Sequence, residues 1–447
     1  MSRLTDRDHF EALAGAVCAA PQAAGLDRAS LSLAAESSDF LRFNRAALRQ
    51  ATQVLQAQAT LAVVRGSKRA ESSVSLSGDL AQDTRRLLDE RARLLSDLDF
   101  VPDDPWLLLP QAASTSLRED HGALPEAETV IAAVREHAAG RDLVGFYAGG
   151  PVVRAYADSR GSRHWHRVET FHFDWCTYHS ADKAVKTAYA GTRWDGAEFA
   201  RRAEDAARRA PLLQRPARRL KPGAYRAAFS PDAMNELLGT LAWGGFGLKA
   251  RRTGVSSLMQ LEHGDAQLHP SVQIAEAVAR GNAPAFTAEG FARPNEVPLV
   301  RDGRSVGTLN SPRSAREYGV AANGAVPAET PDSLSLAPGA LPHDRLLETL
   351  GTGLFVSNLW YLNYSDRQAC RMTGMTRFAC FWVEAGQLVA PLDVMRFDDS
   401  FLRMFGDGLV GLTDRAETLP EAGTYQSRQL SSITTPAAVV EDWRLTL

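Results

Sequence analysis

Residues 143–194 constrain the fold most, because this stretch alternates strand-forming segments with turn signals. The strand segments are LVGFYA, VVRAYA, HWHRVETFHFDW and KAVKTAYAG, and the first turns fall at Gly149-Gly150 and at DSRG. Connections this short join antiparallel neighbours, since parallel strands need a crossover of a dozen or more residues. The stretch therefore predicts an antiparallel meander.

Amphipathic helices flank these strands. Helical spacing of apolar residues predicts helices near 6–20, over 79–98, in PEAETVIAAVREHAAG and over 197–210. Before the second helix, Leu31, Leu33, Phe40 and Phe43 suggest short strands around a polar turn, and further strands are predicted at 54–64 and 72–77. Strands and helices in separate blocks indicate an α+β class.

The length of 447 residues and an apolar content of 45% predict two domains. The segment QRPARRLKPGAYR has the composition of a linker, so we place an N-terminal α+β domain at 1–220, with layered helices and antiparallel strands and the meander at 143–194. A β-rich domain follows at 221–447. It should contain a strand pair around Asp302-Gly303, a strand at 333–336 in a Pro- and Gly-rich loop, and a hairpin around Ala385-Gly386.

Composition excludes several functional classes. Fifty basic and 53 acidic residues argue against a general nucleic-acid binder or a polybasic membrane protein. No uninterrupted apolar run approaches 18 residues, and the N-terminus lacks a signal-peptide pattern. Four cysteines without CxxC spacing indicate neither a disulfide framework nor a zinc knuckle. A soluble, cytoplasmic protein is expected.

Residues 229–248, FSPDAMNELLGTLAWGGFGL, form the clearest predicted helix. Ser230 can cap the first turn, Pro231 suits the first helical position, and Gly244-Gly245 supplies a stop. An apolar face at helical spacing should be buried in a core; it comprises Met234, Leu237, Leu238 and Leu241. Between Glu236 and the end of this stretch at Leu248, there is no His, Cys or carboxylate. This helix therefore offers no metal ligands of its own.

The densest group of potential metal ligands is RHWHRVETFHFDWCTYH. On one strand, His164, His166 and His172 would share a face with Asp174 and Cys176. Same-side neighbours on a strand lie roughly 7 Å apart, so one tetrahedral site would take at most two of them. A solvated strand is the more economical interpretation, and the metal site remains an alternative.

Other chemical motifs are weak. There is no GxSxG, and Cys380 lies in the apolar run FACFW, where a buried, inert thiol is the usual outcome. Gly351-Thr352-Gly353 lacks the Lys of a phosphate loop, and GGFG at 244–247 follows a helix instead of opening one. The basic run at 201–226 is typical of a solvated helix face and linker, with an acidic partner as the alternative.

Three blocks of sequence resemble the TldD/PmbA family, also called modulators of DNA gyrase or U62-like peptidases. The blocks are SSDFLRFNRAALRQATQ, FSPDAMNELLGTLAWGGF, and FTAEGFARPNEVPLVRDGRSVGTL with GTGLFVSNLWYLNYSD and RFACFWVEAGQLVAPL. They occur in the family's order and together span most of the chain. The resemblance implies a TldD/PmbA-type β-rich C-terminal domain.

The resemblance also implies a branch within the family. The TldD branch carries an HExxxH helix with two zinc-binding His and a Glu that activates water, whereas the PmbA (TldE) branch lacks it. Aligned on Leu237-Leu238, the three positions fall on Gly239, Thr240 and Gly244. Glycine has no donor atom, and threonine is no general base at neutral pH. FACFWVEAGQ is also more similar to the PmbA branch.

The resemblance thus implies a PmbA-like, non-catalytic subunit that pairs with a TldD-like zinc metallopeptidase and helps to cleave unfolded or leader peptides. The zinc would belong to the partner, and this chain would hold no cofactor. Residues that could line a peptide cleft are Trp360, Tyr361, Asn363 and Tyr364, with the edge of the 376–384 strand available for strand addition. Core packing is the commoner role for such aromatics. The chain could also form a homodimer.

Two rival functions stay open. One is a stand-alone metal-dependent peptidase that uses the histidine group instead of an HExxxH motif. The other is a non-enzymatic regulator of a nucleic-acid enzyme, as the family's older name implies, although direct nucleic-acid binding and membrane association are not expected from the charge balance.

Overall fold

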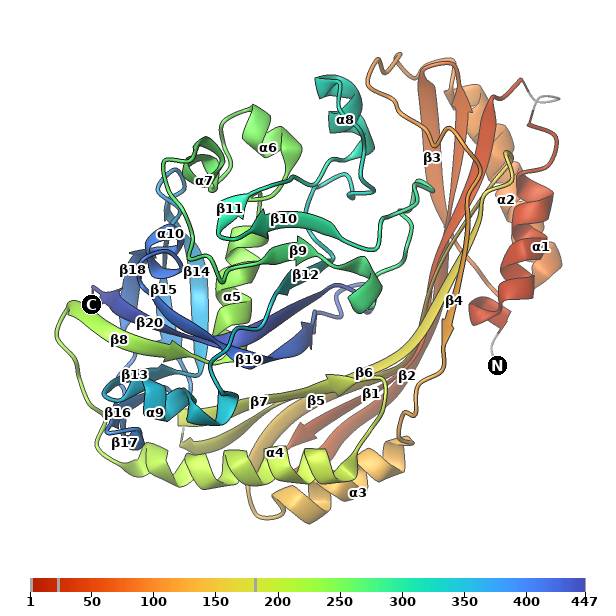
Figure 1. Ribbon diagram of the computed structural model, residues 1–447. Helices are drawn as coiled ribbons and strands as arrows, with labels where there is room; N and C mark the ends of the chain where they lie inside the picture. Colours follow the sequence, from red (N-terminus) through yellow and green to blue (C-terminus); the bar gives the residue numbers. More distant parts are fainter. Residues whose placement is uncertain (1–2, 22–24, 181–182, 447) are drawn as a thin grey trace.

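A computed structural model describes residues 3–21, 25–180 and 183–446, and the strands of these residues form two sheets (Figure 1). The fold is α+β, as predicted. The first sheet has seven strands in the order β3-β2-β1-β5-β6-β4, with β7 paired to β6. These strands are β1 (Arg28–Asn44), β2 (Ala47–Arg65), β3 (Lys68–Ser75), β4 (Thr115–Asp120), β5 (Asp142–Asp158), β6 (Arg163–Ser180) and β7 (Lys183–Gly191).

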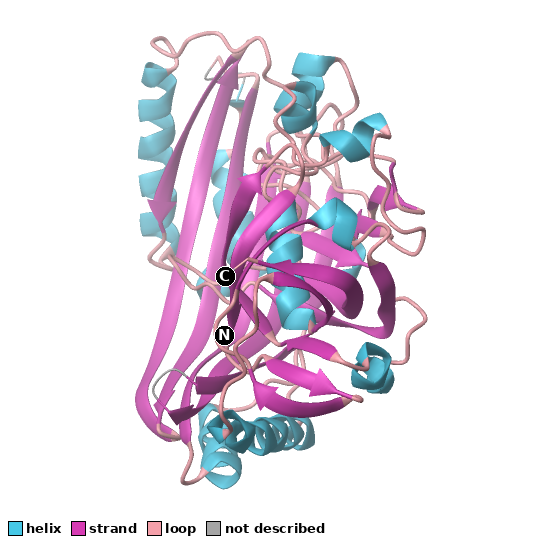
Figure 2. Ribbon diagram, turned by 90° about the vertical axis from the view of Figure 1, so that its left-hand side faces the viewer, coloured by secondary structure: helices cyan, strands magenta, loops and turns pink. Residues whose placement is uncertain are grey.

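The first sheet is long and curved, and the C-terminal half of the chain lies against its concave face (Figures 1 and 2). Helices cover the outer face in two pairs; they are α1 (Arg7–Val17), α2 (Leu80–Asp97), α3 (Ala127–Ala138) and α4 (Gly196–Arg209). β5, β6 and β7 pair antiparallel in sequence order, which confirms the predicted meander. The parallel pairing of β4 with β6 had no signal in the sequence.

The prediction of a turn at Gly149-Gly150 was wrong, because β5 continues through both residues. β5 and β1 keep one register on both sides of this point, with Val152 opposite Glu36 and Gly149 opposite Asp39. Gly150 has φ +140, and a Cβ there would lie 2.1 Å from the Ser37 carbonyl oxygen. Glycine therefore permits a close backbone approach here, which is one of its usual roles inside a strand.

The two short strands expected around Leu31 and Phe43 are likewise one strand, the 17-residue β1. β1 is paired along its length with β2, and the turn between them is Arg45-Ala46, with φ +52 and +56. Left-handed conformations at both central residues define the hairpin turn that normally takes Asn-Gly. The non-glycine residues at this turn hid it from sequence reasoning.

The second sheet has thirteen strands among the described residues, in the order β11-β10-β9-β12-β20-β8-β13-β16-β17, with β14, β15, β18 and β19 off this path. Its strands are β8 (Gly223–Phe229), β9 (Ile274–Glu276), β10 (Val297–Arg301), β11 (Arg304–Ser305), β12 (Ser333–Leu336), β13 (Gly353–Val356), β14 (Asn358–Asp366), β15 (Arg371–Arg377), β16 (Phe381–Glu384), β17 (Gln387–Pro391), β18 (Arg396–Ser400), β19 (Leu409–Pro420) and β20 (Ser432–Leu445). The strand predicted at 333–336 and the turn at Ala385-Gly386 are confirmed.

The helices of the C-terminal half are α5 (Pro231–Ala242), α6 (Leu248–Arg252), α7 (Met259–His263), α8 (Pro312–Tyr318), α9 (Leu346–Leu350) and α10 (Phe401–Met404). None of the helices described is long and apolar enough to cross a membrane.

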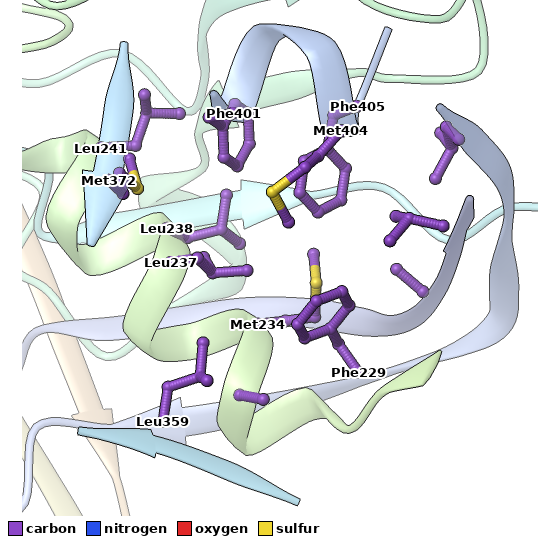
Figure 3. Close-up of a cluster of buried hydrophobic side chains, with 14 of the residues drawn as sticks. Phe229, Met234, Leu237, Leu238, Leu241, Leu359, Met372, Phe401, Met404 and Phe405 are labelled. Atoms are coloured by element: carbon purple, nitrogen blue, oxygen red, sulfur yellow. The ribbon is translucent and has the colours of Figure 1, made fainter. Parts of the chain in front are cut away.

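Helix α5 anchors the larger core. The Ser230 hydroxyl accepts the amide of Ala233, and Pro231 occupies the first turn, as predicted. Its apolar side chains are buried among residues of β8, β14, β15 and α10 (Figure 3). The helix ends at Ala242, earlier than the predicted stretch, and Gly244 follows at φ +78.

Arg428, in the loop between β19 and β20, joins the two halves. Its buried guanidinium donates to the carbonyl oxygens of Gly150 and Thr170 at 2.9 and 2.7 Å. Burial lowers the pKa of Arg428 to about 10, and Leu430 packs on Val152 and Val168 of the first sheet. This loop therefore holds the C-terminal half against the concave face.

We expect Leu238→Ala to lower the free energy of unfolding by about 2–5 kcal/mol, because the fully buried side chain would leave a cavity under α5. The matched control is Leu88→Ala on α2, whose side chain is 40% exposed and whose loss should cost less than about 1 kcal/mol. Guanidinium unfolding of both variants measures the difference. Equal losses would contradict the placement of α5 in the core.

Candidate functional site

A cavity of about 910 Å³ lies between the two halves of the chain, where the polar face of α5 is turned toward β6 and β7. Its titratable lining comes from five elements and one loop: His172 and Asp174 from β6, Lys186 from β7, Arg202 from α4, Asp232 and Glu236 from α5, Glu417 from β19, and Glu421 from the loop after it. Gly239, Thr240, Trp243 and Leu362 also line it. A volume of this size and a location between domains are typical of ligand sites.

β6 builds one wall of this cavity because both of its faces are covered. Its odd-numbered aromatic side chains, such as Phe173 and Trp175, pack against Phe199 of α4. Its even-numbered side chains face the C-terminal half, where His166 Nε2 lies 2.9 Å from the Asn282 carbonyl oxygen. The strand that the sequence suggested was solvated on one flank is therefore buried on both.

The structure gives the three histidines of the sequence-based alternative separate surroundings. His164 is held between the hydroxyls of Ser114 and Ser116 and stacks on Phe286, with ring centroids 4.8 Å apart. His166 is tied to Asn282, and only His172 reaches the cavity. Within the described ranges, no three His, Cys, Asp or Glu side chains are grouped to hold a metal ion.

The positions of the HExxxH motif lie along and just past α5. Gly239 faces the cavity, and a Cβ there would make ordinary contact with Ile433 at 3.8 Å. The Thr240 hydroxyl donates to the Glu236 carbonyl oxygen at 2.9 Å, and Gly244 lies beyond the helix end in a left-handed conformation. The residues present do not fit a zinc ion, since two lack donor atoms and the third is bonded to its own helix.

Only some carboxylates of the cavity have a cation close by. Lys186 Nζ lies 3.8 Å from Asp174 Oδ1, and Arg202 Nη1 lies 3.7 Å from Glu417 Oε2. Burial, and then the negative charge of Glu417, raise the pKa of Asp232 to about 6. Burial also raises the pKa of Glu236. The α5 side of the cavity thus carries two acidic groups in surroundings that disfavour their charge.

The sequence analysis did not identify Asp232 as a site residue, and it named Glu236 only as the last carboxylate of this helix. Their spacing of four residues places both on one helix face, and this signal was available. Local spacing could not predict the opposite wall of the cavity, because even β7, the nearer of its two strands in sequence, ends 40 residues before α5 begins.

Aromatic and arginine side chains border the cavity. Trp243, the residue after α5, is 57% exposed, and the Arg367 guanidinium lies over both its ring and that of Tyr364, at 4.9 and 4.6 Å from the centroids. The Tyr364 hydroxyl donates to the Thr240 carbonyl oxygen at 2.9 Å. This contact fastens β14 to the end of α5.

The four residues predicted to line a cleft all lie on β14. Trp360 and Tyr361 are 49% and 76% exposed, so these two rings are not core residues, while Tyr364 is half-buried. Asn363 accepts the amide of Tyr364 through its own side chain. Tyr364 contacts α5 through its bond to Thr240. The exposed rings of Trp360 and Tyr361 contact each other at a tilt of 50°, with centroids 5.5 Å apart.

The expectation of a free edge at 376–384 was wrong. β15 is paired on both sides, with β14 and β18, and β16 lies between β13 and β17. The edge strand of this layer is β14 itself, which among the described residues pairs only with β15. Tyr361, at φ +60, interrupts this pairing with a bulge.

The cysteines form no second candidate site. Cys370 and Cys380 are buried, and burial raises the pKa of the Cys370 thiol to about 12. Burial raises the pKa of Cys380 as well, so neither thiol is a ready nucleophile at neutral pH.

Comparison with protein-family models shows the family to which this chain belongs. The model of the PmbA/TldA metallopeptidase C-terminal domain matches residues 222–447, just over half of the chain. The chain belongs to the PmbA/TldD family. The matched region begins one residue before β8 and includes the whole second sheet, α5 and the C-terminal walls of the cavity. No curated protein matches this PmbA/TldD-family chain in sequence.

Solved structures share the fold of this family member over nearly its full length. TldE from Thermococcus kodakarensis superposes with a TM-score of 0.79 at 12% identity, covering 98% of this chain and 100% of that one. Two proteins described as candidate modulators of DNA gyrase, from Thermotoga maritima MSB8 and Bacteroides thetaiotaomicron VPI-5482, each have a TM-score of 0.75 at 14% identity. Both alignments cover 98% of this chain and, respectively, 100% and 99% of the other. At these identities the likeness establishes the fold.

Restoring the motif residues should not restore a zinc site. In the triple variant Gly239→His, Thr240→Glu and Gly244→His, the third side chain would start beyond the end of α5, with its Cβ 3.2 Å from Arg367 Nη1 and a backbone conformation that favours glycine. We expect less than about 0.1 zinc per chain, which is the sub-stoichiometric level of a chain without a complete ligand set, by plasma mass spectrometry after dialysis. One tightly bound zinc per chain would show that the positions fit the metal.

Asp232→Asn should stabilise the chain at high pH. The raised pKa of Asp232, which faces Asp174, Lys186, Arg202 and Glu417, means that the folded state loses stability as pH rises from about 4 through about 6. Relative to wild type, the variant should therefore gain up to about 3 kcal/mol of unfolding free energy between pH 4 and pH 8. Urea unfolding at both values measures it.

The matched control for this prediction is Asp407→Asn, at an exposed position outside the cavity. Its difference from wild type should stay within about 0.5 kcal/mol at both pH values. The prediction fails if Asp232→Asn and Asp407→Asn behave alike.

Proposed function

We propose that this chain is the non-catalytic, TldE-like subunit of a TldD-type zinc metallopeptidase that cleaves unfolded or leader peptides. The observation that carries the proposal is the state of the three motif positions: Gly239 and Gly244 offer no ligand, and Thr240 is bonded within α5. The catalytic zinc would then be held by the partner. Family membership and the similarity to a TldE fold support this assignment.

The peptide would enter the cavity between the two halves along β14. An edge strand can add an extended peptide through main-chain hydrogen bonds, and β14 has such an edge beside α5. The exposed rings of Trp360, Tyr361 and Trp243 supply apolar contact area at the rim. Trp, Tyr and Arg are also the residues enriched at protein interfaces, so this rim suits a partner subunit as well as a peptide.

The rival functions receive less support. A stand-alone metallopeptidase would need ligands that converge, and His164, His166 and His172 have different partners. A nucleic-acid role would need free cations, yet Arg201, Arg202, Arg208 and Arg209 of the basic run are paired with Glu198 or Asp205 on the same helix.

Co-expression with a TldD-type protein that carries HExxxH tests the proposal. We expect the two chains to co-purify, with about one zinc per pair and with casein or leader-peptide cleavage only in the pair. Replacing the Glu of the partner's motif by Gln should reduce cleavage at least about 10²-fold, because that side chain is the general base. Full activity of this chain alone would overturn the proposal.

A further inference from the structure

Two carboxylates of the cavity lack a direct ion-pair partner. Asp232 and Glu236 lie four residues apart on the cavity side of α5. Among the described residues, Lys186 acts on both of them electrostatically, but neither carboxylate makes a direct ion pair or a side-chain hydrogen bond. Like charges at this spacing destabilise a helix. Two acidic groups on other walls of the cavity differ, since Lys186 faces Asp174 and Arg202 faces Glu417.

A buried histidine on the opposite wall also lacks a partner. His172 is 7% exposed, lines the cavity, and has no hydrogen bond to Nε2. Burial, with the nearby positive charge of Arg428, lowers its pKa to about 4, so the ring is neutral at physiological pH. A neutral imidazole protonated at Nδ1 offers Nε2 as an acceptor. Because His172 lines the cavity, a donor group of a ligand bound there could complete this nitrogen.

These groups suit an organic cation better than a metal ion. Carboxylates four residues apart on a helix have Cβ atoms about 5–6 Å apart, whereas one divalent ion draws its oxygen ligands to about 2.0–2.6 Å from itself. No three ligand side chains within the described residues are grouped closely enough for a metal. A guanidinium group, with five donors spread over a plane, can reach both carboxylates and an imidazole nitrogen.

We propose that this cavity binds the cationic side chain of a basic peptide, with Asp232 and Glu236 as its charge partners and His172 as a hydrogen-bond acceptor. The inference rests on the proposed function, in which the cavity receives peptide, and it adds the substrate class: peptides with arginine or lysine near the segment held at β14. The cavity volume of about 910 Å³ accommodates such a side chain with its neighbours.

Paired peptides test the charge requirement directly. One fluorescein-labelled heptapeptide carries a single central arginine, and the other carries citrulline, which has nearly the same shape without the charge. Fluorescence anisotropy with the full chain at pH 8 and low salt should give at least about tenfold tighter binding of the arginine peptide, a difference of about 1.4 kcal/mol. At this pH Asp232 is ionised.

Variants of the chain test which side chains produce the preference for the arginine peptide. Asp232→Asn with Glu236→Gln should reduce binding of the arginine peptide to the citrulline level, and His172→Phe should weaken it about fivefold, the worth of one neutral hydrogen bond. The matched control is Asp89→Asn with Glu136→Gln, which removes the same charge from exposed positions on α2 and α3, helices of the outer face. This control should keep the arginine preference.

The outcomes separate the two proposals. Equal binding of both peptides to the wild-type chain would overturn the cation site while leaving peptide binding intact. An arginine preference that survives in the Asp232→Asn and Glu236→Gln variant would also overturn it. Absence of binding by either peptide at 1 mM, about −4 kcal/mol, would remove both the cation site and the peptide cavity of the proposed function.

Discussion

The packing of β6 on both of its faces is the constraint on which the rest of the structure depends. One face carries Phe173 and Trp175 against the outer helices, and the other carries His164, His166 and His172 toward the C-terminal half. Polar side chains on a covered face need partners. His164 has its polar partners in Ser114 and Ser116, and His166 has its partner in Asn282 of the C-terminal half. His172 has no partner for Nε2 and lines the cavity.

Helix α5, like β6, has two faces with different roles. Its apolar face fills the larger core, while Asp232, Glu236 and Gly239 face the cavity. Since the core holds the helix rigidly, the polar face is presented at a fixed position opposite β6 and β7. Gly239 and Gly244 give this helix no zinc ligands, but its cavity face carries two carboxylates without a direct ion pair. Charge selection of a peptide is the role that we propose for these groups.

The sequence predicted the structure correctly where a pattern is local and is compatible with only one kind of structure. The cap at Ser230, the strand Ser333–Leu336 and the antiparallel order of β5 to β7 all follow from spacing and turn chemistry. It failed at Gly149-Gly150, because adjacent glycines are suited both to a turn and to a close backbone approach within a strand, and only the position of Ser37 on β1 distinguishes the two. It failed at Arg45-Ala46 because tertiary packing imposes a turn that these residues do not favour.

By itself the sequence determined the α+β class, the family, and the absence of ligands at Gly239 and Gly244, because side-chain chemistry needs no coordinates. Tertiary structure alone decided which polar groups meet. Asp232 and Glu236 are neighbours on one helix turn, but His172 and Lys186 come from strands of the other sheet. It also decided that β14, and not the 376–384 segment, has the free edge. Strand pairing and burial are long-range properties, and they set both the exposure of Trp360 and the raised pKa of Asp232.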